Sequence, residues 1–165
     1  MNVRPVRAFI GLGSNLGDPH AQLERALAAL AGLPGTVLRE VSSTYRTAPW
    51  GDTDQPDFFN AVAAIDTMLS PEDLLGALRG IEATAGRRRD RRWGPRTLDL
   101  DLLLYGEVMR DTPDLQLPHP RMHQRAFVLV PLAELAPALV LGEHGSVTEA
   151  LARIGSAGVH RLDSE

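Results

Sequence analysis

The clearest pattern of apolar and polar positions lies at residues 97–105, where alternation gives way to an apolar run. This pattern is typical of a buried strand in a central sheet. Residues two apart on a strand share a face, so the pattern predicts that Asp99 and Asp101 lie side by side. The leucines that alternate with them take the other face: Leu98, Leu100 and Leu102. Two like charges on an interior strand are costly unless something positive lies between them, so the strand predicts a cation site.

Apolar periodicity in the rest of the chain predicts further strands and helices. Runs bounded by turn residues predict strands at residues 3–10, 36–47 and 58–67. Helical spacing predicts a helix that starts at Asp18-Pro19 and another that starts at Ser70-Pro71. In both, an N-cap side chain is followed by proline at the first helical position.

The C-terminal third is expected to be mostly helical. A hairpin-like excursion is predicted from Gly106 to Leu117, followed by a helix through Val130, with Pro131 opening a second short helix. Ser146 is expected to cap a last helix, and the tail from Gly155 is expected to be loosely held.

The predicted order of strands and helices is β-α-β-β-α-β, followed by the helical part. This order indicates an α+β fold of ferredoxin-like type, with helices packed on an antiparallel or mixed sheet. A chain of 165 residues fits a single domain, 1–165, with a core at about 5–135 and a C-terminal helical extension at 136–165.

Composition narrows the function. The 44% hydrophobic content indicates a soluble globular protein, and the apolar runs are too short to span a bilayer. The absence of cysteine excludes disulfides and thiol chemistry, and a cytoplasmic location is expected. All 17 basic residues are arginine, which excludes P-loop and Schiff-base lysines. A net charge of −4 argues against a dedicated nucleic-acid binder.

Arginines gather just upstream of the two aspartates. Six of the 17 basic residues fall within ten positions, Arg87 to Arg96. A lone Asp-x-Asp is more often two surface aspartates on an edge strand, or a pair in which one aspartate caps a turn. The arginines favour a polyphosphate site, because Mg²⁺ takes one or two carboxylates plus substrate phosphates, and two such ions about 3.5–4 Å apart form a clamp for phosphoryl chemistry.

Other candidate features allow a structural interpretation as well as a functional one. Residues 11–18 resemble a dinucleotide fingerprint only superficially and are interpreted as a tight strand-to-helix turn. Trp50, in a predicted loop, either packs on the domain or belongs to a mobile lid. Glu82 is interpreted as an arginine partner or a surface residue, and less readily as part of the nucleotide site. His119 and His123 are interpreted as ordinary surface residues, because no carboxylate or cysteine lies at helical metal spacing from them and a zinc site is not expected.

Several separate motifs resemble the 6-hydroxymethyl-7,8-dihydropterin pyrophosphokinases of folate biosynthesis. The similarity is collinear over about residues 5–135. The motifs that carry it are Gly11-Leu12-Gly13-Ser14-Asn15-Leu16-Gly17, Ser43-Thr44-Tyr45-Arg46-Thr47, Gln55-Pro56-Asp57-Phe58-Phe59-Asn60, Arg92-Trp93-Gly94-Pro95-Arg96-Thr97-Leu98-Asp99-Leu100-Asp101 and Pro118-His119-Pro120-Arg121.

The resemblance implies transfer of a diphosphate from ATP to the hydroxymethyl oxygen of the pterin, with release of AMP. It implies that Asp99 and Asp101 hold two Mg²⁺ ions and act catalytically together with Arg87 and Arg96. The implied contacts of the nucleotide are Glu82, Arg89, Arg92, Trp93, Leu102, His119 and Arg125. The implied contacts of the pterin are Thr47, Ala48, Trp50, Phe58, Asn60 and Phe127, with the two phenylalanine rings on its faces.

Two departures from the family pattern limit this transfer of roles. Relatives carry glutamine at the place of Arg79, and the arginine loop is one residue shorter than in some of them. Which of Arg87, Arg88 and Arg89 faces ATP therefore stays open.

Two other functions fit parts of the pattern. A ferredoxin-like RNA-binding domain would use the arginines on phosphates, but it should carry aromatic residues on its central strands, where this chain has aspartates. A nucleotidyltransferase would share the paired carboxylates and differ in its acceptor. Product analysis separates the three, because only a pterin diphosphotransferase yields AMP and a pterin diphosphate.

Overall fold

The computed structural model describes residues 4–15, 17–48, 56–85 and 98–162. Within these ranges the elements are β1 (Val6–Ser14), α1 (Pro19–Ala31), β2 (Thr36–Val41), β3 (Tyr45–Thr47), β4 (Phe58–Thr67), α2 (Pro71–Thr84), β5 (Asp99–Tyr105), β6 (Arg110–Asp111), β7 (Gln116–Leu117), η1 (Met122–Gln124), α3 (Ala126–Leu135), η2 (Gly142–His144), α4 (Val147–Ile154) and β8 (Val159–Arg161).

One antiparallel sheet organises these elements. Its strand order is β5-β1-β4-β3-β8, and β2 also pairs with β4. Strand β5 lies at one edge, so the expectation that the aspartates occupy an interior strand is wrong. The strand is apolar because both of its faces are covered. Leu100 and Leu102 belong to the apolar cluster of α1 and α2, whereas Leu103 belongs to that of α3 and α4.

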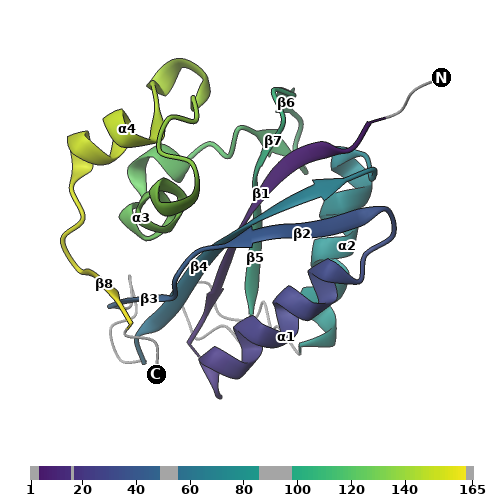
Figure 1. Ribbon diagram of the computed structural model, residues 1–165, viewed down its shortest axis with the longest axis horizontal. Coiled ribbons are helices and arrows are strands. Elements are labelled where there is room, and N and C mark those ends of the chain that lie inside the picture. Colours follow the sequence, from purple (N-terminus) through teal and green to yellow (C-terminus); the bar gives the residue numbers. More distant parts are fainter. Residues whose placement is uncertain (1–3, 16, 49–55, 86–97, 163–165) are drawn as a thin grey trace.

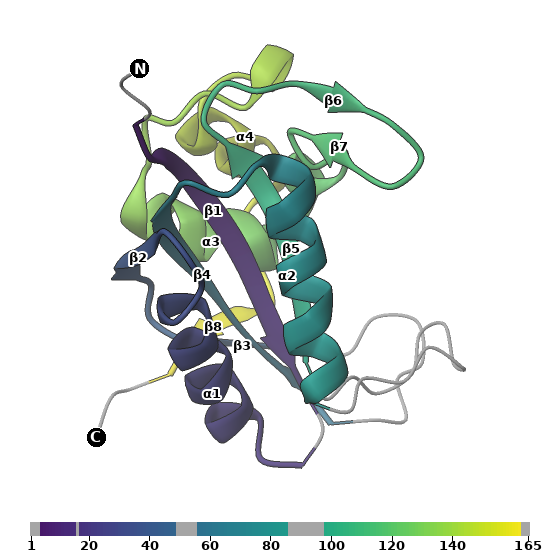
Figure 2. The same cartoon turned by 90° about the vertical axis from the view of Figure 1, so that its right-hand side faces the viewer.

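Helices cover both faces of the sheet (Figure 1, Figure 2). Alternate residues of β1 and β4 point into different apolar clusters: Ile10 and Ile65 face α1 and α2, while Phe9 and Val62 face α3 and α4. The period-2 pattern of the strands thus supplies two cores, one on each face.

The predicted helix starts are confirmed by their capping bonds. The Ala21 amide donates to Asp18 Oδ1 at 3.1 Å, and the Asp73 amide donates to Ser70 Oγ at 3.1 Å. Ser146 and Glu149 form a reciprocal capping box at the start of α4. Strand β4 occupies the predicted range 58–67.

Other predicted boundaries are wrong. Strand β1 runs on to Ser14, and the predicted strand 36–47 breaks into β2 and β3 around Ser42, whose hydroxyl accepts from the Val62 amide at 2.9 Å. Helix α3 passes through Pro131 without a break. Its apolar side chains Leu129 and Leu132 are fully buried, and this burial outweighs the helix-breaking tendency of proline.

The tail from Gly155 is also more ordered than expected. Residues of β8 pair with β3 in the register Tyr45↔Arg161 and Thr47↔Val159, and the Leu162 amide donates to the Thr44 carbonyl at 2.9 Å. Strand β8 therefore lies beyond β3 on the side of the sheet away from β5. Within the described ranges, no helix has the length and apolar character needed to cross a membrane.

Candidate active site at the end of the sheet

A row of residues across three strands forms the floor of the candidate site. Asp99 of β5 lies opposite Gly13 of β1, and Gly13 lies opposite Asn60 of β4. Two residues earlier on β1, Gly11 lies opposite Asp101. Because glycine has no side chain, the surface between the aspartates and Asn60 is open. A ligand can therefore approach the backbone of β1 closely.

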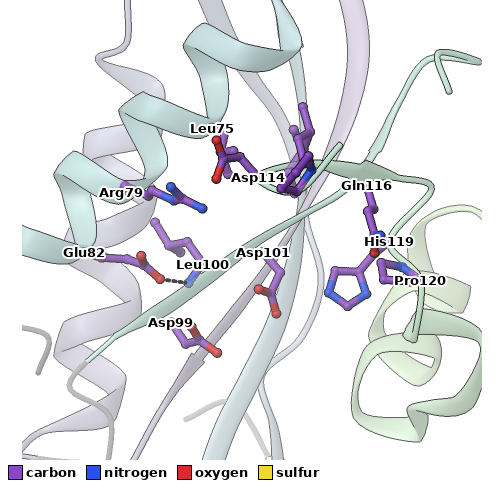
Figure 3. A pocket seen from close by; sticks show the side chains of 13 residues that line it. Leu75, Arg79, Glu82, Asp99, Leu100, Asp101, Asp114, Gln116, His119 and Pro120 are labelled. Carbon is purple, nitrogen blue, oxygen red and sulfur yellow. Dashed lines mark hydrogen bonds between the residues drawn. The ribbon is translucent and has the colours of Figure 1, made fainter. Parts of the chain in front are cut away.

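The two aspartates are half-buried and share one face of β5, as the alternation predicts. They line a cavity of about 370 Å³ between β5, α2 and the segment Pro113–Pro120. Figure 3 shows Asp99 and Asp101 on β5, with Arg79 and Glu82 reaching in from α2 and His119 on the opposite side. The cavity is large enough for part of a nucleotide-sized ligand.

A second, much smaller hollow lies on the other side of the same aspartates. Its lining includes Gly13, Asn60 and Phe127, together with Asp99 and Asp101. The carboxylates thus face two hollows at once. A ligand in each hollow would therefore approach the same pair of carboxylates.

Asn60 is fixed by its neighbour on β3. Its side-chain amide nitrogen donates to Thr47 Oγ1 at 2.8 Å, and the residue is buried. With that nitrogen engaged, the amide oxygen points toward β1, where a Cβ built on Gly13 would come within 3.1 Å of it. The side chain thereby presents an oriented acceptor beside the smaller hollow.

His119 follows the cis Leu117–Pro118 bond, and its ring lies in the wall of the larger cavity. Burial lowers the pKa of His119 to about 4, and the positive charge of Arg125 adds to this effect. The ring is therefore neutral near pH 7. Its Nδ1 accepts from the Arg121 amide at 3.2 Å, which assigns the proton to Nε2 and makes that nitrogen a donor.

Arg125 and Phe127 meet at the start of α3. The guanidinium carbon of Arg125 lies 5.7 Å from the centre of the Phe127 ring, within the range of a cation–π contact. Both residues are half-buried. The pair places a cation and an aromatic face beside the aspartates.

The structure brings together many of the residues singled out in the sequence. Asp99, Asp101, Leu102, Glu82 and His119 line the larger cavity. Asn60 and Phe127 line the smaller hollow, and Thr47 contacts Asn60. Phe58 is half-buried opposite Thr47, and Ala48 is exposed, but neither lines a cavity described above. Seven further candidates lie outside the described residues: Trp50, Arg87, Arg88, Arg89, Arg92, Trp93 and Arg96.

The interpretation of Glu82 as a surface residue is wrong, whereas its interpretation as an arginine partner stays a prediction, because the arginines of residues 87–96 lie outside the described residues. The side chain is 4% exposed, and its Oε2 accepts from the Leu100 amide at 2.9 Å. The residue falls on the buried side of α2 with Leu74 and Leu78, at the i, i+4, i+8 spacing of one helix face. The sequence pattern did not reveal this position, because buried helix positions were identified by their apolar side chains and glutamate is charged.

Some cavity residues had no signal in the sequence. Leu75, Asp114 and Gln116 line the larger cavity, but they come from a helix and a hairpin that only the folded chain brings near β5. Gly11 and Gly13 did carry a signal that was misinterpreted. They lie inside β1 rather than in a turn, and glycine at alternate strand positions marks a close approach.

The two carboxylates of this site suit a metal ion that is also coordinated by the phosphates of a ligand. No group of three or more His, Cys, Asp or Glu side chains that could hold a metal ion occurs in the part of the chain that the structure describes. Mg²⁺ in phosphoryl-transfer sites usually takes one or two carboxylates and completes its shell with phosphate oxygens and water. Asp99 and Asp101, side by side at an open cavity, fit that requirement.

Comparison with known sequences identifies close relatives. The family model described as 7,8-dihydro-6-hydroxymethylpterin-pyrophosphokinase (HPPK) matches residues 9–137. A Pseudomonas aeruginosa protein is 53% identical over 156 residues, covering 94% of this chain and 96% of the relative. A Methylorubrum extorquens protein is 51% identical over 157 residues, covering 95% and 99%. Both relatives are named 2-amino-4-hydroxy-6-hydroxymethyldihydropteridine pyrophosphokinase.

Solved structures share the fold at low sequence identity. Wild-type Plasmodium falciparum HPPK-DHPS with pteroate superposes with a TM-score of 0.77 at 11% identity, covering 99% of this chain and 49% of that one. A triple mutant of the same protein with pteroate gives a TM-score of 0.75 at 13% identity, covering 97% and 47%. The chain thus spans about half the length of these structures.

Proposed function

The chain belongs to the 7,8-dihydro-6-hydroxymethylpterin-pyrophosphokinase family, and from this membership we propose which of its residues serve the two substrates. The reaction transfers a diphosphate from ATP to the hydroxymethyl group of 6-hydroxymethyl-7,8-dihydropterin in folate biosynthesis and releases AMP. The hydroxymethyl oxygen forms a bond to the β-phosphorus of ATP. The bond from that phosphorus to the α–β bridging oxygen breaks, the oxygen leaves with AMP, and the alcohol proton is released.

ATP is assigned to the larger cavity and the pterin to the smaller hollow. The single observation that carries this assignment is the position of Asp99 and Asp101, which line both hollows. The β-phosphorus and the hydroxymethyl oxygen would meet at these carboxylates. Such transfers depend on in-line positioning and on stabilisation of phosphate charge more than on covalent chemistry.

The pterin is a flat heterocycle with polar edges. Phe127 offers an aromatic face in the smaller hollow, Phe58 is proposed for the opposite face, and the Asn60 amide, held by Thr47, offers a fixed acceptor. Backbone groups of Thr47, Ala48 and Trp50 are proposed as further contacts.

The nucleotide needs cations and donors along its phosphates. His119, neutral and with its Nε2 proton free to donate, can bind a phosphate oxygen without adding charge. Arg125 supplies a cation that lies over the Phe127 ring and is close enough to lower the pKa of His119. We extend the proposal to the loop arginines and Trp93, with Leu102 against the adenine. The loop residues proposed are Arg87, Arg89, Arg92 and Arg96.

Asp99 and Asp101 are proposed to hold Mg²⁺, two ions in total. When bound, Mg²⁺ neutralises phosphate charge and orients the ATP oxygens around the reacting phosphorus. The aspartates by themselves would repel a polyphosphate, so the carboxylate pair makes ATP binding depend on the cation.

We also propose the topology of the sheet, the extent of the domain and the location of the protein. The strand order β5-β1-β4 followed by β2 and β3 supports a ferredoxin-like topology, with β8 as an added edge strand. The two apolar clusters share β1 and β4, which supports one domain over 1–165, with the helical extension at 136–165. A sequence without cysteine agrees with work in the cytoplasm.

Substituting each aspartate by asparagine tests the site. We expect Asp99→Asn and Asp101→Asn to lower turnover by at least about 10²–10³-fold, because a metal clamp contributes several kcal/mol to the transition state. Formation of AMP and the pterin diphosphate should be followed by mass spectrometry as Mg²⁺ is titrated. Asp73→Asn, at an exposed position in the first turn of α2, is the matched control. Wild-type turnover in either site variant contradicts the metal assignment.

A further inference from the structure

Among the strands that the structure describes, β5 is the last one at its edge of the sheet, and the two aspartates lie on it. It pairs with β1 on one side, and on the other side α2 packs against it. An edge strand has backbone N–H groups that no neighbouring strand can satisfy. At Leu100 the acceptor is a side chain, because the Leu100 amide donates to Glu82 Oε2 at 2.9 Å (Figure 3).

Glu82 takes the place of a neighbouring strand at this one position. Its side chain comes from the last turn of α2 and is 4% exposed. A hydrogen bond from an amide to a buried carboxylate is stronger than a bond between neutral groups, and its geometry is well defined. The bond therefore fixes the distance between α2 and β5 at Leu100.

Leu100 is the residue between Asp99 and Asp101. Its side chain is 5% exposed and packs in the cluster of α1 and α2, opposite Leu12 of β1. Its position is thus set by apolar packing on one face and by Glu82 at the edge. Because the strand is pleated, a shift or rotation at Leu100 changes the directions of both flanking carboxylates together.

We propose that Glu82 is a positioning residue, which holds β5 through the Leu100 amide so that Asp99 and Asp101 keep the spacing and direction that a bound divalent cation requires. This inference rests on the proposed function of the two aspartates. It assigns to Glu82 a hydrogen bond to the protein backbone, in place of a contact with the nucleotide. Side chains that orient metal ligands commonly matter nearly as much as the ligands.

Three substitutions separate the possible roles of the carboxylate. Glu82→Gln keeps an acceptor oxygen at the same reach and removes the charge. Glu82→Asp keeps the charge but withdraws the oxygen by one methylene, and Glu82→Leu removes the acceptor altogether. Glu72→Gln, at an exposed position on the same helix, is the matched control.

The first measurement uses the protein without metal or nucleotide. Amide hydrogen exchange at Leu100, resolved by NMR, should accelerate in Glu82→Leu and Glu82→Asp and stay near the wild-type rate in Glu82→Gln. The second measurement is the Mg²⁺ concentration for half-maximal turnover, together with kcat and the KM for the pterin. In the Leu and Asp variants we expect a higher Mg²⁺ requirement or a lower kcat by about 10–100-fold, with the pterin KM unchanged.

Two results with the Glu82 variants would contradict the positioning role. It fails if folded Glu82→Leu keeps the wild-type Mg²⁺ requirement and kcat, or if Glu82→Gln is as impaired as Glu82→Leu, since charge would then matter and the backbone bond would not. Should Glu82→Leu fold poorly in a thermal melt, Glu82→Asp decides by the same criteria. Wild-type turnover in Asp99→Asn or Asp101→Asn would instead refute the metal assignment, while the exchange rate of Leu100 still tests the bond.

Discussion

The imidazole of His119 is a donor without charge, and this property comes from its surroundings. Burial and Arg125 lower its pKa from 6.5 to about 4, against the opposing influence of Asp99. In the unfolded chain the ring has its ordinary pKa. Between these two values the unfolded state binds a proton that the folded state does not, so stability rises with pH.

The first prediction concerns this linkage. The contribution of His119 to the free energy of unfolding should rise from about pH 4 to pH 6.5 and stay constant above that range. Its upper limit is about 3 kcal/mol, from about 1.4 kcal/mol per pKa unit. Urea unfolding of wild type and His119→Gln at pH 4.5 and pH 7 measures the difference. A variant with the same pH slope as wild type contradicts the prediction, and His160→Gln at an exposed position controls for histidine content.

Gly13 gives a second prediction at this scale. A methyl group there would lie 3.1 Å from Asn60 Oδ1, closer than an ordinary contact, so the amide must shift. Gly13→Ala should raise the KM for the pterin about tenfold without unfolding the protein, since small displacements at a binding group are costly.

Gly76→Ala in α2 is the control for Gly13→Ala. A Cβ at Gly76 meets nothing within 4 Å, so this variant should keep the wild-type KM and gain about 0.8–1 kcal/mol of helix stability. Steady-state kinetics and thermal unfolding measure both effects. An unchanged KM in Gly13→Ala would show that Asn60 does not read the pterin.

At the scale of elements, the three-residue strand β3 depends on parts of the chain far away in sequence. It pairs with β4 on one side and β8 on the other. Glu134 of α3 accepts from the Tyr45 hydroxyl at 2.7 Å and from the Ser43 amide at 3.0 Å. Burial and this bond raise the pKa of Tyr45 to about 12, so the hydroxyl stays a donor. The strand in turn carries Thr47, which orients Asn60.

Truncating the chain after Gly158 removes β8 and tests whether this strand stabilises β3. With one edge of β3 unpaired, the protein should lose about 1–2 kcal/mol of stability, from a few backbone hydrogen bonds. The KM for the pterin should rise several-fold while the KM for ATP stays the same, because β8 pairs with β3, and β3 carries the Thr47 that holds Asn60. His160→Ala, which keeps the backbone of β8, is the control. Equal pterin KM in the truncated and full-length chains contradicts the proposed support of β3.

For the whole molecule, the two apolar clusters share the central strands β1 and β4. A change in either cluster is therefore transmitted to the same strands. Leu30→Ala in the α1 layer and Leu129→Ala in the α3 layer should each cost about 2–5 kcal/mol, since both side chains are fully buried.

Each variant should still unfold in one transition, because neither layer has a sheet of its own. Denaturant unfolding followed by far-UV circular dichroism and by fluorescence tests this expectation. Two separated transitions in Leu129→Ala would show that the α3–α4 layer unfolds as a separate unit.

Local sequence determined much of this protein. Helix starts at Asp18, Ser70 and Ser146, strand β4 and the shared face of Asp99 and Asp101 follow from caps and from strand periodicity, which act between residues close in the chain. The motifs also identified the family. These features needed no knowledge of the fold, because their physical causes are local.

Tertiary structure decided the rest. That β5 is an edge strand, that Glu82 holds it at Leu100, and that β8 supports β3 depend on pairings between segments distant in sequence. A polar residue on a buried helix face has the same sequence signal as one on the surface, and only a partner across space distinguishes them. Likewise, an apolar run shows that a strand is covered, but burial is non-directional and does not reveal whether a helix or another strand covers it.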